Sequence, residues 1–421
     1  MADKDIMKEL VRNSVTLLSA NAISQGIAFV VLPVIARLYS PEELGILSLF
    51  LGIEGILSVV ANGKYEFAII LAKEKQRAAD TFNLCFLINA AFSFSLLVLL
   101  LLGAPSILKT LHYESLKDVV YYLPFFVFVV AFAQASTFWF NYNKRFSLTA
   151  RYCLGQGITN SGLKVGLGFL KAGLTGLIWA NFLSHIFAIL SCFTRKETWK
   201  GLFHFNKNNI LSVASQHRKF PQYTLPHSFI NYLAGNLPIF LLSGYFGMAE
   251  VGLFSMGITL GFRPINLLSN SLDQVISQKI AEKTNKKEPI WINIYQSLKK
   301  ILFVAFPLFI LVFFLVPFIV KYFLGDRWEQ SALYIQIMMP WFLVNLFAAS
   351  LSSIPAVFGK QRTALIIEII YIVIRFLALC IGVYMHSFVW AIILFSLVST
   401  IVLTVQLIWF LLLVRKYEQS L

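Results

Sequence analysis

The feature that most constrains this sequence is a series of apolar runs, each about twenty residues long. Coiled as helices, such runs match the hydrocarbon thickness of a bilayer. Only 13% of the residues are charged, against roughly a quarter in soluble domains. A water-soluble fold could not bury so much apolar surface, and the runs lack the alternation of membrane β-strands. The sequence therefore predicts an all-α polytopic membrane protein.

The apolar runs predict twelve transmembrane helices in two lobes. We expect the helices over 13–36, 43–62, 80–103, 119–141, 148–169, 173–194, 224–244, 250–273, 301–323, 331–356, 363–384 and 388–413. The expected organisation is an N-terminal six-helix lobe over 1–194, a basic cytoplasmic linker over 195–223 and a C-terminal six-helix lobe over 224–421.

The two expected lobes share a weak sequence repeat. The pattern E-x-G-x-x-S begins at Glu43 and again at Glu250, 207 residues later. Lys164 precedes a Trp-Ala pair by fifteen residues, and Arg375 precedes a second such pair by the same spacing. Two lobes of six helices insert the same way up, so a pseudo-two-fold axis along the membrane normal would relate them. This arrangement leaves a cleft between two bundles and suits an alternating-access transporter.

The basic residues predict the orientation of the chain. Most of the 35 Lys and Arg residues fall in alternate inter-helix segments, on the side of the N-terminus. Cytoplasmic loops are the basic ones, so both termini are expected in the cytoplasm. This bias accounts for most of the net charge of +15, and no nucleic-acid partner is needed to explain it. The sequence has no G-x-x-x-x-G-K-[ST] motif, which excludes an ATP-driven transporter on one chain.

Ionisable side chains inside the predicted helices are few, and each is costly unless it faces water or a partner. They are Glu54, Lys164, Arg263, Glu368 and Arg375. The three cations predict a positive cleft for an anionic ligand such as a phosphate or acidic sugar. A guanidinium group in particular can form bidentate hydrogen bonds with phosphate oxygens. Structural pairing is the alternative, either Glu54 with Arg263 or Glu368 with Arg375. Glu54 is also a candidate ion-coupling site.

Polar amides recur in the first helix of each expected lobe. Asn21 and Gln25 are four residues apart and share a helix face, and Asn236 lies in the corresponding later helix. They predict either a lining of the cleft or hydrogen bonds between helices. Trp328, Trp341 and Tyr384, near the ends of predicted spans, are interpreted as interface anchors.

The first predicted helical hairpin resembles that of a known family. The residues that carry the likeness are Arg37-Leu38-Tyr39-Ser40-Pro41-Glu42-Glu43-Leu44-Gly45 and, after the second helix, Gly63-Lys64-Tyr65-Glu66-Phe67-Ala68-Ile69-Ile70. They resemble the polysaccharide repeat-unit exporters, the O-antigen (Wzx-type) flippases of the multidrug/oligosaccharidyl-lipid/polysaccharide (MOP) superfamily. Chain length, twelve spans and inside termini fit the same family.

The resemblance implies a MOP-like fold in the bacterial inner membrane. It implies a flippase for undecaprenyl-pyrophosphate-linked oligosaccharide, working from the cytoplasmic to the periplasmic leaflet with ion coupling in some members. The implied partners are the lipid-linked substrate, membrane lipids and a polysaccharide polymerase. No residue role can be carried over from the family, because no fixed catalytic motif defines it.

Two other functions stay open at this stage. A multidrug or metabolite antiporter of the same superfamily would carry more central carboxylates than cations, the reverse of the balance here. A membrane enzyme would need a larger far-side loop than any in this sequence, so we expect a protein that is not an enzyme. The spacing of the four cysteines suggests no metal site, and we expect no cofactor.

Overall fold

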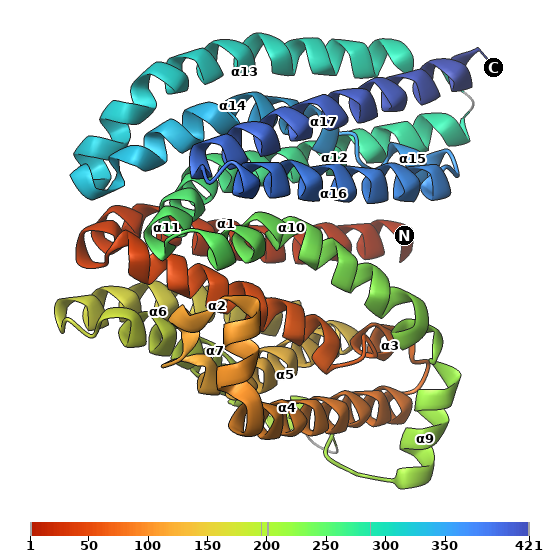
Figure 1. Ribbon diagram of the computed structural model, residues 1–421. Helices are drawn as coiled ribbons and strands as arrows, with labels where there is room; N and C mark the ends of the chain where they lie inside the picture. The colour runs from red at the N-terminus through yellow and green to blue at the C-terminus, as the bar shows by residue number, and fades with distance from the viewer. Residues whose placement is uncertain (1, 195, 200–201, 287, 420–421) are drawn as a thin grey trace. The chain divides into compact units, whose positions relative to one another are not determined.

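The computed structural model describes residues 2–194, 196–199, 202–286 and 288–419. Within these ranges every regular element is a helix, as the apolar runs predicted. The chain divides into two compact units, Met1–Gly244 and Tyr245–Leu421 (Figure 1). We call these the N-terminal unit and the C-terminal unit.

The N-terminal unit is built of long helices joined by short turns. They are α1 (Ala2–Leu38), α2 (Pro41–Ala61), α3 (Glu66–Leu71), α4 (Lys75–Leu111), α5 (Leu123–Tyr142), α6 (Phe146–Phe169), α7 (Gly173–Phe193), α8 (Lys196–Trp199), α9 (Lys207–Gln216) and α10 (Leu225–Tyr245). Short 3-10 segments η1 (Glu114–Leu116) and η2 (Val120–Tyr122) connect α4 to α5, and the π-helix η3 (Phe220–Thr224) precedes α10. Helix α10, expected in the C-terminal lobe, falls almost wholly within this unit; the predicted lobe boundaries stay a prediction.

The C-terminal unit repeats this pattern of long helices. Its elements are α11 (Met248–Gly257), the π-helix η4 (Ile258–Phe262), α12 (Arg263–Asn285), α13 (Trp291–Ile319), η5 (Val320–Leu324), η6 (Asp326–Trp328), α14 (Glu329–Ala349), α15 (Ile354–Val357), α16 (Gln361–Tyr384) and α17 (Phe388–Glu418). Glu43 and Glu250 each lie in the first turn of a helix, and Lys164 and Arg375 each lie in the penultimate long helix of their half. Their equivalence in two related lobes stays a prediction.

Ten helical stretches of the described chain are long and apolar enough to cross a membrane. Two further predicted spans, 148–169 and 224–244, are helices at α6 and α10, of 24 and 21 residues, but they are not among those ten. Helix α6 carries a series of polar side chains that lowers its hydropathy. The count of twelve therefore stays a prediction.

The turn between α1 and α2 forms as the sequence chemistry indicates. Ser40 caps α2: its hydroxyl accepts from the backbone N–H of Glu43 at 3.2 Å, and the Glu43 carboxylate accepts from the N–H of Ser40 at 2.7 Å. This reciprocal capping box satisfies two backbone donors that the helix leaves unpaired. Pro41 stands at the first helical position, where its missing N–H costs nothing.

The basic mid-chain segment is docked on the N-terminal unit. Trp199 and Ile210 belong to one buried cluster with residues of α4 and α5. The buried carboxylate of Asp80 accepts from the Asn209 side chain at 3.3 Å, and the indole of Trp139 donates to the Thr198 carbonyl at 2.9 Å. Figure 1 shows α9 beside α4. Of the predicted linker, Arg195, Lys200 and Gly201 lie outside the described residues.

Within the C-terminal unit, α17 packs against both α14 and α16. The approach of α16 to α17 depends on Gly382, because a methyl group built there would overlap the backbone of Ala391. At the other end of the unit, Asp273 of α12 accepts hydrogen bonds from the Ser353 N–H at 3.2 Å and hydroxyl at 2.6 Å, just before α15. These contacts hold the helices around the site described below.

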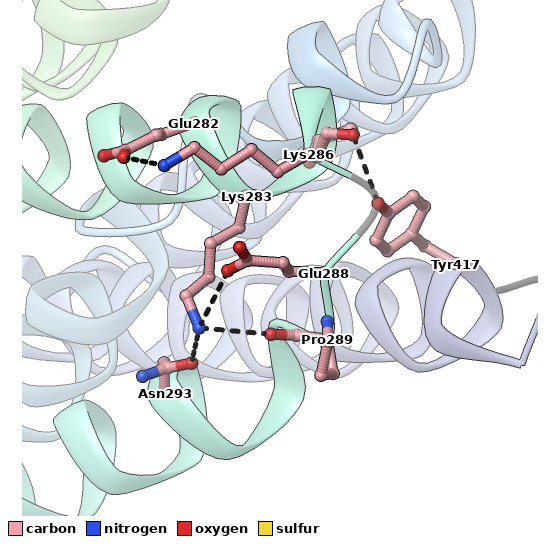
Figure 2. A network of polar contacts seen from close by, with 8 residues as sticks. Glu282, Lys283, Lys286, Glu288, Pro289, Asn293 and Tyr417 are labelled. Atoms are coloured by element: carbon pink, nitrogen blue, oxygen red, sulfur yellow. Dashed lines mark hydrogen bonds and ion pairs between the residues drawn. The ribbon is translucent and has the colours of Figure 1, made fainter.

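The turn between α12 and α13 carries a polar network (Figure 2). The Lys283 ammonium donates to the Asn293 side chain at 2.8 Å and to the Pro289 carbonyl at 3.4 Å. Lys286 pairs with Glu282 at 2.7 Å on an exposed helix face. Exposed pairs of this kind contribute little stability, so the network fixes the path of the turn rather than the fold of the unit.

Candidate functional site

Arg375 lies inside the C-terminal unit, enclosed by aromatic rings from three helices. Its guanidinium carbon is 4.3 Å from the ring centre of Phe395 on α17, 4.8 Å from that of Tyr371 on α16 and 5.8 Å from that of Trp341 on α14. The residue is 7% exposed. Aromatic faces carry partial negative charge, so the three rings partly solvate the cation.

The ion pair between Arg375 and Glu368, the alternative to a ligand site, does not form in the described structure. Among the described residues Arg375 makes no ion pair, and its Nε has no hydrogen-bond partner. Glu368, two turns earlier on α16, is half-buried. The structure thus holds a buried positive charge that a carboxylate does not neutralise, which is costly for folding.

Arg263 begins α12, directly after the π-helix η4. Pro264 explains the widened turn: it has no N–H to donate, and its ring clashes with the carbonyl four residues earlier. Arg263 is exposed, and no ion pair involves it in the described part of the chain. π-Helical turns of this kind are frequent at functional sites.

The residue that precedes Arg263 contacts one of the aromatic rings that surround Arg375. The ring of Phe262, adjacent to Arg263, stacks on Trp341 at 4.8 Å between centroids, and Trp341 in turn borders Arg375. Trp341 is 5% exposed, and Trp328 is fully buried. The interpretation of these two tryptophans as interface anchors was therefore wrong: they pack inside the unit.

Glu54 lies on α2 in the N-terminal unit and is buried at 8% exposure. Its carboxylate accepts a hydrogen bond of 2.6 Å from Ser58, one turn later on the same helix. Tyr232 of α10 packs at this level of α2, since its hydroxyl donates to the Leu51 carbonyl at 3.4 Å and occupies the space beside Gly55. Glu54 is thus a buried carboxyl group with a hydroxyl donor.

A stripe of polar side chains runs along α6, which sequence reasoning missed except for Lys164. Tyr152, Gln156, Asn160 and Lys164 follow one another at intervals of four residues. The first three form hydrogen bonds to α7. Tyr152 bonds to His185 at 2.7 Å, Gln156 donates to Ser184 at 3.4 Å, and Asn160 donates to Asn181 at 2.9 Å. Lys164 is half-buried, and its carbonyl accepts from the Tyr39 hydroxyl at 2.7 Å. The four-residue spacing was the signal that could have revealed this stripe.

The three predicted amides differ in their surroundings. Asn21 and Gln25 are exposed on α1, beside the face where Ser24 packs closely on Gly157 of α6. Asn236 is half-buried, and its amide donates to the Tyr232 carbonyl on its own helix at 3.0 Å. The hydrogen bond of Asn236 is therefore intrahelical, not interhelical.

The predicted residues thus fall into two groups, a cationic one in the C-terminal unit and a polar one around Glu54 and α6 in the N-terminal unit. Among the described residues no group of three His, Cys, Asp or Glu side chains could hold a metal ion. Each group by itself offers charged or polar side chains that can bind a ligand within its own unit.

Comparison with known proteins adds three findings. Residues 34–333 match the family model described as "Polysaccharide biosynthesis protein". Among solved structures, an inward-facing multidrug resistance MATE family transporter of the MOP superfamily superposes with a TM-score of 0.71 at 15% identity, over 98% of this chain and 99% of that one. The lipid II flippase MurJ, in an inward closed conformation, superposes with a TM-score of 0.73 at 13% identity, over 97% and 90%. A search of curated proteins returned no match.

These findings define the chain as a multi-pass α-helical membrane protein with the fold of MOP-superfamily transporters. It belongs to the polysaccharide biosynthesis protein family. The expected family is confirmed, and the fold is the one expected for the MOP superfamily.

Proposed function

We propose that this protein is a flippase that moves undecaprenyl-pyrophosphate-linked oligosaccharide from the cytoplasmic to the periplasmic leaflet of the bacterial inner membrane. The observation that carries the proposal is the pair of arginines, Arg263 and Arg375, neither of which has a carboxylate partner in the described chain. Membership of the polysaccharide biosynthesis family supports a glycan substrate. A pyrophosphate linkage supplies the anionic charge that the arginines require.

In this proposal each predicted site residue has a role that follows from its charge and hydrogen-bonding groups. Arg263 is exposed and contacts the pyrophosphate directly, while Arg375 adds positive charge behind it. Lys164 and the amides of Asn21, Gln25 and Asn236 bind acidic or hydroxyl groups of the sugars. Glu54 is the ion-coupling residue of an alternating-access cycle, because a buried carboxyl group can gain and lose a proton or cation.

The orientation and setting of the protein are part of the same proposal. Both termini lie in the cytoplasm, because the basic segments gather on that side. A polysaccharide polymerase on the periplasmic side receives the translocated unit. The MOP fold is shared with multidrug transporters, so export of a cationic drug is the second candidate function. Arg263 and Arg375, which have no carboxylate partner among the described residues, oppose the binding of a cationic ligand in the C-terminal unit.

Complementation of a deletion strain tests the proposal. The wild-type gene restores surface polysaccharide on a gel, and Arg263→Ala does not. Arg263→Lys restores part of it, because lysine keeps the positive charge but cannot form the bidentate hydrogen bonds of a guanidinium. Arg362→Ala is the matched control, since Arg362 is an exposed arginine at the start of α16. Normal polysaccharide in the deletion strain, together with new drug sensitivity, would favour the antiporter.

A further inference from the structure

Several hydrogen-bond donors around Arg375 have no partner within the described protein. They are the Nε of Arg375, the indole Nε1 of Trp341 and the amide Nδ2 of Asn345, each with less than 1 Å² of accessible surface. Trp341 and Asn345 are one turn apart on α14 and share a face. Three donors without acceptors in one small region indicate that the region binds an acceptor.

A fourth polar group reaches the same region from α17. Ser399 is fully buried, and its hydroxyl has no partner among the described residues. It follows Phe395 by one turn, and the Phe395 ring is 4.3 Å from the Arg375 guanidinium carbon. Helices α14, α16 and α17 therefore each direct a polar group to this part of the C-terminal unit.

The chemistry of these groups defines the ligand. Arginine and the tryptophan indole only donate hydrogen bonds, and serine donates as readily as it accepts. The guanidinium also carries a buried charge that lacks an ionic partner in the described residues. A water molecule could accept hydrogen bonds here but would leave the charge uncompensated, whereas an anion does both.

We propose that Arg375, Trp341, Asn345 and Ser399 form a binding site for a small monovalent inorganic anion, such as chloride, inside the C-terminal unit. The small size follows from the burial of the donor atoms, which a sugar-linked pyrophosphate could not reach without separating the helices. While no pyrophosphate is bound, the anion balances the charge of Arg375 and stabilises the packing of α14, α16 and α17.

The experiment measures thermal unfolding of the purified full-length protein in lipid nanodiscs as chloride replaces gluconate at constant ionic strength. In the wild type, chloride raises the Tm in a saturable manner. Arg375→Gln abolishes the rise. Asn345→Leu increases the half-saturating chloride concentration about tenfold, the effect of one lost hydrogen bond to an ion. Arg362→Gln removes an exposed charge from the same helix and leaves the response as in the wild type.

Three results overturn the proposal. The first is a wild-type Tm that is the same in chloride and gluconate. The second is an unchanged chloride response in Asn345→Leu, which keeps the test decisive where Arg375→Gln does not fold. The third is stabilisation by inorganic pyrophosphate but not by chloride, lost in Arg375→Gln, which assigns the donors to the substrate instead. The experiment measures anion binding and not export. The anion site can therefore be confirmed or overturned whatever the outcome of the complementation test of the flippase proposal.

Discussion

The guanidinium of Arg375 lies 4.3 Å from the centre of the Phe395 ring, closer than to any other aromatic ring that it contacts. The two residues come from adjacent helices of one hairpin, α16 and α17. The contact places a buried cation against an apolar surface instead of a carboxylate. The protein therefore retains a buried charge that no carboxylate neutralises among the described residues, which is a frequent property of functional sites in membranes.

Replacing Arg375 with methionine is expected to separate stability from function. Arg375→Met removes the cost of a buried, unpaired charge and keeps an apolar side chain, so the free energy of unfolding rises by about 1–4 kcal/mol in gluconate buffer. Export of polysaccharide is lost. Size-exclusion chromatography after heating measures the first effect, and complementation measures the second. The exposed Arg362→Met changes stability by less than about 0.5 kcal/mol. A less stable but active Arg375→Met protein would contradict this account.

Gly382→Ala is expected to destabilise the C-terminal unit. The added methyl group meets backbone atoms of Ala391, which cannot move without separating α16 from α17. Overpacking of this kind costs about 1–3 kcal/mol, and the rigid contact favours the upper end. The control is Gly166→Ala on α6, where the methyl group meets no atom within 4 Å and helix propensity improves. Equal melting temperatures for the two variants would show that the hairpin is not closely packed.

Gly55 and Tyr232 are expected to be energetically coupled. Gly55→Ala places a methyl group where the Tyr232 hydroxyl lies and destabilises the protein by about 1–3 kcal/mol. Tyr232→Ala removes both the hydroxyl and the ring carbons that the methyl group would meet, and it loses the 3.4 Å hydrogen bond to Leu51. The double variant is then more stable than the sum of the single effects predicts. A double-mutant cycle on thermal unfolding measures the coupling, and strict additivity would refute the contact.

The docking of α9 is expected to weaken as the pH falls. Partial burial and the nearby Arg77 cation lower the pKa of His217 below its ordinary value of 6.5. Undocked His217 therefore binds protons more readily, so the stabilisation present above that value is lost as the pH falls through it. The protection factors of residues 207–217, which are exchange rates corrected for the intrinsic rate at each pH, fall as the pH is lowered from about 7.5 to about 6. His217→Gln removes this loss of protection; its persistence in that variant would exclude His217 as the cause.

Much of this protein could be predicted from its sequence because lipid leaves the backbone few options. Every polar backbone group within a membrane must be satisfied inside its own segment, so apolar runs of sufficient length become helices. The same reasoning singled out Glu54, Lys164, Arg263 and Arg375, since ionisable groups in such runs are rare. The capping box at Ser40 and Glu43 is also local chemistry, and the structure contains it.

Other features depended on contacts between residues distant in the sequence. Trp341 and Arg375 are 34 residues apart, and only the packing of α14, α16 and α17 places the indole beside the guanidinium. Glu368 is closer to Arg375 in the sequence than Trp341 is, but it forms no ion pair with Arg375 in the described structure. The mid-chain segment, interpreted as a linker, is docked by Trp199 and by the Asp80 hydrogen bond.

The sequence by itself thus determined which segments are helices and which residues are out of place in lipid. Only the tertiary structure decided what surrounds those residues. The physical reason is that helix formation in a membrane is governed by hydrogen bonds four residues apart, whereas the environment of Arg375 is set by side chains from three helices.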